Sequence, residues 1–212
     1  MSRLSFHKLT AVSAQLLSAV CYPMLMPVWA MLLLCAAVSR YAAPLPAAYT
    51  AFVIGGTALF CFLVPLLVVL LLIRQGVVTD LYINNSRERT LPYVYSLVSM
   101  LVWVFFLWQV VKMPAVVTLM ALAGTMVLAL VALINRWWKI SVHLAAFGGL
   151  TGAVCGYCWH ASLNPTLLIS LFFIGALLLM LARLRLNAHT PLQLVCGYLL
   201  GLCLTFLPAL FC

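Results

Sequence analysis

The sequence predicts an all-α fold, a polytopic transmembrane helical bundle of six to seven spans that forms one integral membrane domain over residues 1–212. Of the 212 residues, 67% are hydrophobic and only 6% are charged. Soluble domains are roughly half apolar and about a quarter charged, so this composition places the protein in a membrane. Helices are predicted because unpaired backbone groups cannot face lipid.

Seven apolar runs each have the roughly 20 residues that a helix needs to cross a bilayer. The first run is long and contains Pro23 and Pro27, so we expect it to be kinked, tilted or partly re-entrant, which would leave six clean spans. Pro114 and Pro165 each stand just before a later run, where a helix tolerates proline. The runs cover residues 12–39, 48–73, 93–111, 115–134, 142–160, 164–182 and 191–211.

The charges of the protein are mostly basic and mostly on one face. Eleven lysines and arginines oppose two acidic residues, which gives a net charge of +9. With seven crossings, the N-terminus and the loops 74–92, 135–141 and 183–190 share a face, and of the basic residues only Arg40 and Lys112 lie on the other. This excess predicts a cytoplasmic site face. The cations form no stripe or tail, so nucleic acid is not expected as a partner.

One polar cluster lies between the last two apolar runs, at Ala182–Gln193. Arg183 and Arg185 can each present a planar fork of donors to phosphate oxygens. His189 follows Arg183 by six residues, near the start of the next predicted helix. Charge is costly beside a bilayer, so its presence here suggests a site suited to phosphoryl chemistry.

Two further clusters share that face. Asp80–Pro92 is the longest polar stretch and contains both acidic residues of the protein. Arg136–His143 places Ser141 and His143 at the start of the fifth apolar run. The first backbone N–H groups of a helix are unpaired and attract an anion, so this position favours phosphate as well.

Together the three clusters resemble the type 2 phosphatidic acid phosphatase superfamily, with degenerate motifs, from about residue 87 to residue 193. The third motif of that family is Ser-Arg, a histidine after five residues and an aspartate after three more. Here Arg183 and His189 keep the family spacing, while Ala182 replaces the serine and Gln193 replaces the aspartate. The resemblance implies a phosphatase-like core at about residues 74–211.

The other two motifs match less completely. The family has Pro-Ser-Gly-His in the second, and this sequence keeps Ser141 and His143 without the proline and glycine. The first is a lysine followed six residues later by Arg-Pro; here Arg87 and Arg89 lie near Pro92 without the lysine.

The resemblance implies a role for each matched residue. His189 would attack phosphorus and form a phosphohistidine, and His143 would protonate the leaving oxygen, because neutral imidazole is a competent nucleophile and proton carrier near neutral pH. Cationic donors would stabilise the charge on the phosphoryl oxygens. Phosphate binding falls to Arg183, Ser141, Arg89 and Arg87, and supporting positions to Gln193, Glu88 and Lys139.

The replacement of aspartate by Gln193 is the most consequential departure. A carboxylate would fix the tautomer of His189 and stabilise its charged form, whereas glutamine orients the ring without supplying charge. Either reduced activity follows, or Glu88 or Asp80 approaches His189 in its place. We also expect Glu88, between two arginines, to form an ion pair within the arginine cluster.

The implied function is hydrolysis of a phosphomonoester or diphosphate of a membrane lipid, with the headgroup in the site and the tail in the bilayer. Undecaprenyl diphosphate, phosphatidic acid, phosphatidylglycerol phosphate and lipid A phosphate are all compatible. The resemblance implies a multi-pass protein of the bacterial inner membrane, without metal or other cofactor, although bacterial relatives commonly carry the site on the outer face. The sequence does not indicate the oligomeric state.

Two other functions remain open. A non-catalytic lipid-phosphate binding or transport protein would use the same basic face, and Gln193 favours it. A membrane thiol oxidoreductase would use Cys155 and Cys158, but most of the eight cysteines lie inside apolar runs, where free thiols behave as small apolar residues. Gly148, Gly152 and Gly156 recur every four residues in the same run, which predicts close helix packing.

Overall fold

A computed structural model describes residues 3–80 and 86–211, with side chains over residues 11–80 and 88–211. Within this part of the chain every regular element is a helix. The elements are α1 (Arg3–Val20), α2 (Met26–Tyr41), α3 (Ala47–Ala58), η1 (Leu59–Leu63), α4 (Val64–Arg74), η2 (Ser86–Arg89), α5 (Thr90–Gln109), α6 (Ala115–Ile134), α7 (Val142–His160), α8 (Thr166–Arg185), α9 (Pro191–Phe206) and η3 (Leu207–Leu210).

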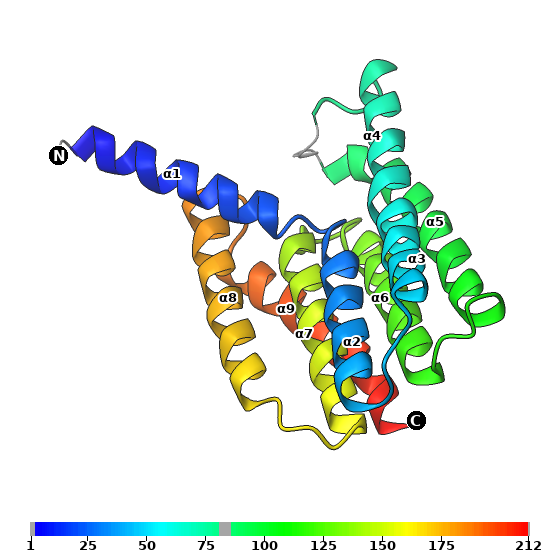
Figure 1. Ribbon diagram of the computed structural model, residues 1–212. Helices are drawn as coiled ribbons and strands as arrows, with labels where there is room; N and C mark the ends of the chain where they lie inside the picture. Colours follow the sequence, from blue (N-terminus) through cyan, green and yellow to red (C-terminus); the bar gives the residue numbers. More distant parts are fainter. Residues whose placement is uncertain (1–2, 81–85, 212) are drawn as a thin grey trace.

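The first apolar run does not form one continuous helix. It divides at residues 21–25 into α1 and α2, which begin and end on either side of Pro23. Proline lacks the N–H that would continue the α1 ladder, and Pro27 occupies a first-turn position of α2, where that loss costs nothing. Figure 1 shows α1 lying across the end of α8, while α2 runs alongside α7.

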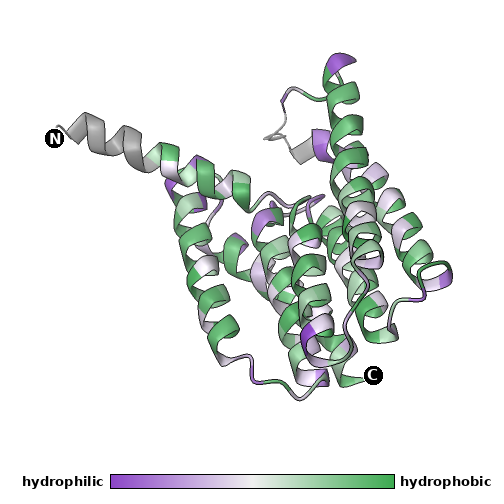
Figure 2. Ribbon diagram, in the orientation of Figure 1, coloured by the Kyte–Doolittle hydropathy of each residue, from purple (hydrophilic) through white to green (hydrophobic). Residues whose placement is uncertain are grey.

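Five helical segments of the described chain are long and apolar enough to cross a membrane, and Figure 2 shows the more hydrophilic residues gathered near the helix ends. The sequence therefore predicted the class of protein correctly, whereas six to seven spans exceed the number that length and composition support. The five segments are Ala47–Arg74, Thr90–Gln109, Ala115–Ile134, Thr166–Arg185 and Pro191–Leu210.

Helix α7 is not among those five segments. Its place in the bundle also differs from theirs. It lies among α2, α6, α8 and α9, and almost every residue from Val142 to Cys158 is buried or half-buried. A helix that faces other helices instead of lipid can carry small and polar residues without an energetic penalty. The N-terminal end of α7, with His143, is thereby fixed inside the molecule.

The contact of α7 with α9 depends on glycine, as the four-residue spacing predicted. A Cβ atom at Gly148 would meet the backbone carbonyl of Tyr198, and one at Gly201 would meet the backbone of Ala145. At Gly197 it would come within 2.6 Å of the carbonyl oxygen of Ser141. The two helices therefore touch backbone to backbone, which holds the start of α9 against the start of α7.

The longest helix contains one irregular turn. Residues of η1 wind as a π-helix between α3 and α4, and its Cys61 lines the central cavity described below. The hydroxyl of Ser99 on α5 donates to the carbonyl of Phe60 at 2.6 Å. A partner from a neighbouring helix satisfies a backbone group that irregular winding exposes, which apolar surroundings require.

Candidate functional site

Four of the predicted site residues line the same cavity, which has a volume of about 200 Å³. Arg89 directly precedes α5, His143 is in the first turn of α7, Arg183 is in the last turn of α8, and His189 directly precedes α9. These four helix ends lie at one end of the bundle (Figure 1). Side chains separated by up to a hundred positions in the sequence therefore converge on one space.

His189 is held by two oxygen atoms. Its Nδ1 lies 3.3 Å from the backbone carbonyl oxygen of Lys139 and 3.3 Å from Oε1 of Gln193. The backbone N–H of Thr190 donates to the same Oε1 at 3.1 Å, which identifies that atom as the amide oxygen. Since both neighbours of Nδ1 are acceptors, Nδ1 carries the proton and donates, and Nε2 keeps a lone pair.

The surroundings of His189 keep its ring neutral. Burial, followed by the positive charge of Arg183, lowers the pKa of His189 to about 4, while the hydrogen bond to Gln193 acts in the opposite direction. Lys139 adds a further positive charge. The lone pair on Nε2 is therefore available at any pH above about 4.

His143 is buried, with 7% of its surface exposed. Within the described chain neither ring nitrogen has a hydrogen-bond partner, and the nearby backbone of Ser18 does not meet hydrogen-bond geometry. Its one ring contact is edge-on with Tyr22, at 6.1 Å between ring centroids. A buried imidazole normally has a partner, so both nitrogens retain capacity for a ligand.

The two arginines are positioned by residues outside the motifs. Arg89 is 7% exposed, and its Nη1 donates to Oδ1 of Asn135 at 3.3 Å. Arg183 donates from Nη1 to the hydroxyl of Ser18, near the end of α1, at 3.4 Å. Both guanidinium groups are thus oriented within the cavity by side chains from other elements.

Lys139 contributes charge beside the cavity and does not line it. Burial and the positive charges of Arg89 and Arg183 lower the pKa of Lys139 below its ordinary value. Three cations are therefore close enough to repel one another, and an anion between them would relieve that repulsion.

The structure does not bring every predicted residue to the cavity. The side chain of Ser141 is fully buried and caps α7 by accepting the N–H of Leu144 at 3.5 Å, so the hydroxyl is not among the groups that line the cavity. A phosphate-binding role for its hydroxyl is inconsistent with this placement. The side chain of Arg87 lies outside the described residues.

The expected carboxylate partner of His189 is also absent from the described structure. Oε2 of Glu88 accepts from the backbone N–H of Thr79 at 2.8 Å and from its hydroxyl at 3.0 Å. The hydrogen-bond partners of His189 are Lys139 and Gln193, so neither Glu88 nor Asp80 replaces the family aspartate. Glu88 instead connects the segment after α4 to the start of α5.

Three residues of the site carried no signal in the sequence. Asn135 orients Arg89, Ser18 accepts from Arg183, and Tyr22 contacts the ring of His143. Tyr22 and Ser18 belong to the apolar run 12–39, for which the sequence predicted a kink but no contact with the site. Only the turn that ends α1 brings them to the site, and no local pattern predicts that contact.

The cysteine pair lies away from the site. Cys155 and Cys158 are buried thiols in α7, and among the described cysteines none forms a disulfide. Cys158 packs in an apolar cluster with Phe147 and Leu179. Over the described residues no group of three or more His, Cys, Asp or Glu side chains is placed to hold a metal ion.

A comparison of the chain with protein-family models, with curated proteins and with solved structures finds no match. The functional argument therefore depends on the residues and their geometry.

Proposed function

We propose that the protein is a lipid phosphatase of the type 2 phosphatidic acid phosphatase kind, which hydrolyses a phosphomonoester or diphosphate of a membrane lipid through a phosphohistidine. The observation that carries the proposal is the hydrogen bonding of His189. Its Nδ1 is fixed as a donor by Lys139 and Gln193, and Nε2 is left as a nucleophile in a cavity that also holds Arg89, His143 and Arg183.

The chemistry follows from these positions. Nε2 of His189 attacks phosphorus, the bond between phosphorus and the leaving oxygen breaks, and that oxygen takes a proton from the charged ring of His143. The negative charge of the bound phosphate favours the charged form of His143, which is otherwise opposed by burial. Arg89 and Arg183 stabilise the charge on the equatorial oxygens.

The second half of the reaction restores the enzyme. His143, now neutral, takes a proton from a water molecule that attacks the phosphohistidine. The bond between Nε2 and phosphorus breaks, inorganic phosphate leaves, and His189 regains its lone pair. One imidazole thus acts first as acid and then as base.

The proposed setting is a multi-pass protein of the bacterial inner membrane with seven crossings. To the five long apolar segments we add α7, which is shielded by its neighbours, and α2. The 16 residues of α2 reach about 24 Å, somewhat less than the hydrocarbon thickness of about 30 Å. Helix α1 would lie along the membrane surface on the side of the site.

Release of phosphate from the purified protein in detergent with lipid phosphates tests this function. We expect His189→Ala and His143→Ala to lower the rate by at least about a hundredfold, since each removes a group that makes or breaks a bond. His160→Ala is the matched control, because His160 is exposed at the opposite end of α7. Equal rates in the wild type and all three variants would exclude the catalytic role.

A second candidate is a non-catalytic lipid-phosphate binding or transport protein. The neutral Gln193 favours it, because glutamine cannot stabilise the charged ring of His189 as an aspartate would. Saturable binding of a lipid phosphate without phosphate release, in the wild type and in His189→Ala alike, would support this alternative.

A further inference from the structure

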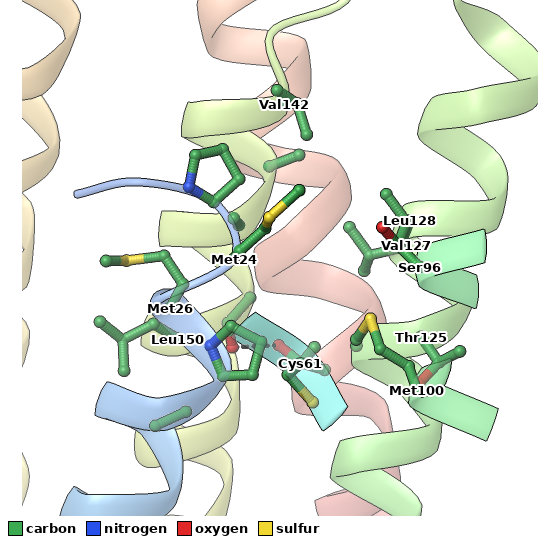
Figure 3. A pocket seen from close by; sticks show the side chains of 18 of the residues that line it. Met24, Met26, Cys61, Ser96, Met100, Thr125, Val127, Leu128, Val142 and Leu150 are labelled. Carbon is green, nitrogen blue, oxygen red and sulfur yellow. Dashed lines mark hydrogen bonds between the residues drawn. The ribbon is translucent and has the colours of Figure 1, made fainter. Parts of the chain in front are cut away.

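The cavity extends far from the phosphate site into the bundle. Besides the four polar residues it is lined by α2, η1, α5, α6 and α7, down to Val104 on α5, Val117 on α6 and Ala153 on α7. At 1.5 Å per residue, these positions lie about 15–25 Å from the ends of their helices on the side of the site. Figure 3 shows side chains that line the shared space, among them Met26, Met100 and Cys61 from the helices and Met24 from the turn between α1 and α2.

Among the described residues, the serine and threonine hydroxyls that line this space beyond its polar end are engaged by backbone carbonyls. The hydroxyls of Ser96 and Thr125 donate to the carbonyls of Pro92 and Ala121 on their own helices. Thr205 donates to two glycine carbonyls, of Gly149 and Gly201. Serine and threonine that bond in this way present mainly carbon to their surroundings. The inner part of the cavity therefore suits hydrocarbon.

A fixed aromatic ring lines the inner part of the space. Trp103 is 3% exposed, donates from Nε1 to the hydroxyl of Thr57 at 3.0 Å, and stacks on Phe60 with 5.4 Å between centroids. Its ring fills the place that a Cβ on Gly56 would occupy. A residue held on three sides cannot move aside cheaply, so this part of the wall is rigid.

From this shape we infer that the protein encloses one hydrocarbon chain of its lipid-phosphate substrate within the helical bundle. Packed carbons lie about 4 Å apart, so one chain has a section of about 13 Å². A volume of about 200 Å³ therefore corresponds to a channel for one chain about 16 Å long. At about 1.2 Å per bond of extended chain, that length is about 13 carbons. The inference rests on the proposed function and deepens it, because the tail was expected to remain in the bilayer.

Gly124 allows a direct test. It lines the channel on α6, and a Cβ added there would meet nothing within 4 Å. Gly124→Leu therefore fills the channel, about 10 Å along α6 from Val131, without displacing protein atoms. Gly55→Leu is the matched control: Gly55 is also helical and also has nothing within 4 Å, but it is exposed and does not line the channel.

The readout is the ratio of kcat/KM for hexadecyl phosphate to that for butyl phosphate. We expect Gly124→Leu to lower this ratio at least tenfold relative to the wild type, while Gly55→Leu leaves it unchanged. An equal ratio in the wild type and both variants would overturn the inference and return the tail to the bilayer.

A binding measurement separates this inference from the proposed function. In His189→Ala, hexadecyl phosphate should raise the midpoint of thermal denaturation more than butyl phosphate does, and adding Gly124→Leu should remove the difference. If that pattern holds while no protein releases phosphate, the channel is retained and the phosphatase function fails. If phosphate is released but chain length affects neither rate nor binding, the phosphatase function is retained and the channel fails.

Discussion

Gln193 performs two tasks with one side-chain oxygen. It accepts the N–H of Thr190 in the capping box that begins α9, and it accepts from Nδ1 of His189. A glutamate would keep both hydrogen bonds, because it has the same length and also accepts, but it would add a negative charge beside the ring. Because the side chain of Gln193 is neutral, it adds no negative charge that would offset the effect of Arg183 on His189.

Gln193→Glu should shift the pH dependence of the rate. The reaction that we propose needs the neutral ring of His189, so the wild-type rate should fall as the pH decreases through about 4, the pKa of His189. The introduced carboxylate favours the charged ring and raises that pKa, so the fall should move upward by at least about one pH unit.

A pH profile of kcat/KM, measured in detergent from pH 3.5 to 8, checks this shift. Gln109→Glu introduces the same charge at the exposed end of α5, on the opposite face, and should leave the profile unchanged. An unchanged profile in Gln193→Glu would mean that another group determines the acidic limb.

At the residue scale, the sequence predicted residues that line one cavity better than it predicted their surroundings. The spacing of Arg183 and His189 and the position of His143 at a helix start are local patterns, and these residues line one cavity. The partners Asn135, Ser18 and Thr79 come from other elements, and tertiary contacts of this kind have no local signature. For that reason the sequence did not predict the hydrogen bonds that Glu88 accepts from Thr79. The expected ion pair of Glu88 within the arginine cluster stays a prediction.

At the scale of the elements, the packing of α7 against α9 depends on the absence of side chains. Gly201→Ala would push a methyl group into the backbone of Ala145 and Gly149. Neither backbone can move without displacing a helix, so we expect a loss of about 1–3 kcal/mol of stability. Gly55→Ala adds the same methyl group where nothing lies within 4 Å and provides the control.

The midpoint of thermal denaturation of both variants in detergent measures this effect. Gly201→Ala should denature several degrees below the wild type and Gly55→Ala should not, because only the first overpacks a contact. Similar midpoints for the two variants would mean that α7 and α9 can separate slightly without cost.

Helix bounds were predictable where a proline or a cap marked them. The runs 115–134 and 142–160 coincide with α6 and α7, which follow Pro114 and the N-cap residue Ser141. The run 12–39 was expected to be kinked, tilted or partly re-entrant because of Pro23 and Pro27, and the chain does break at residues 21–25. Hydropathy alone does not show this break, because the turn is itself largely apolar.

At the scale of the whole molecule, the seven crossings that we propose would put α1 and the end of α9 on opposite sides of the membrane. The excess of basic residues on the side of the site predicts that this side faces the cytoplasm. Trp137→Cys, at a position 76% exposed beside the site, and Ala43→Cys, in the exposed turn between α2 and α3, report the two faces.

A thiol reagent that cannot cross membranes should label Ala43→Cys in intact cells and Trp137→Cys only after permeabilisation. The parent protein, with its native cysteines, provides the background. The reverse pattern would place the site on the outer face, and labelling of both positions from one side would rule out an odd number of crossings between them.

The π-helical turn η1 determines the rotational phase of α4. One additional residue in a helical turn rotates every later side chain by about 100° about the helix axis, relative to uninterrupted winding. Thr57 and Cys61, on either side of the turn's start, both face the channel, while Val69 and Leu72 of α4 are buried in a separate cluster with Val78. A single surplus residue thus lets one continuous helix serve two differently oriented surfaces: its first half borders the cavity, and its second half packs against Val78, next to Thr79.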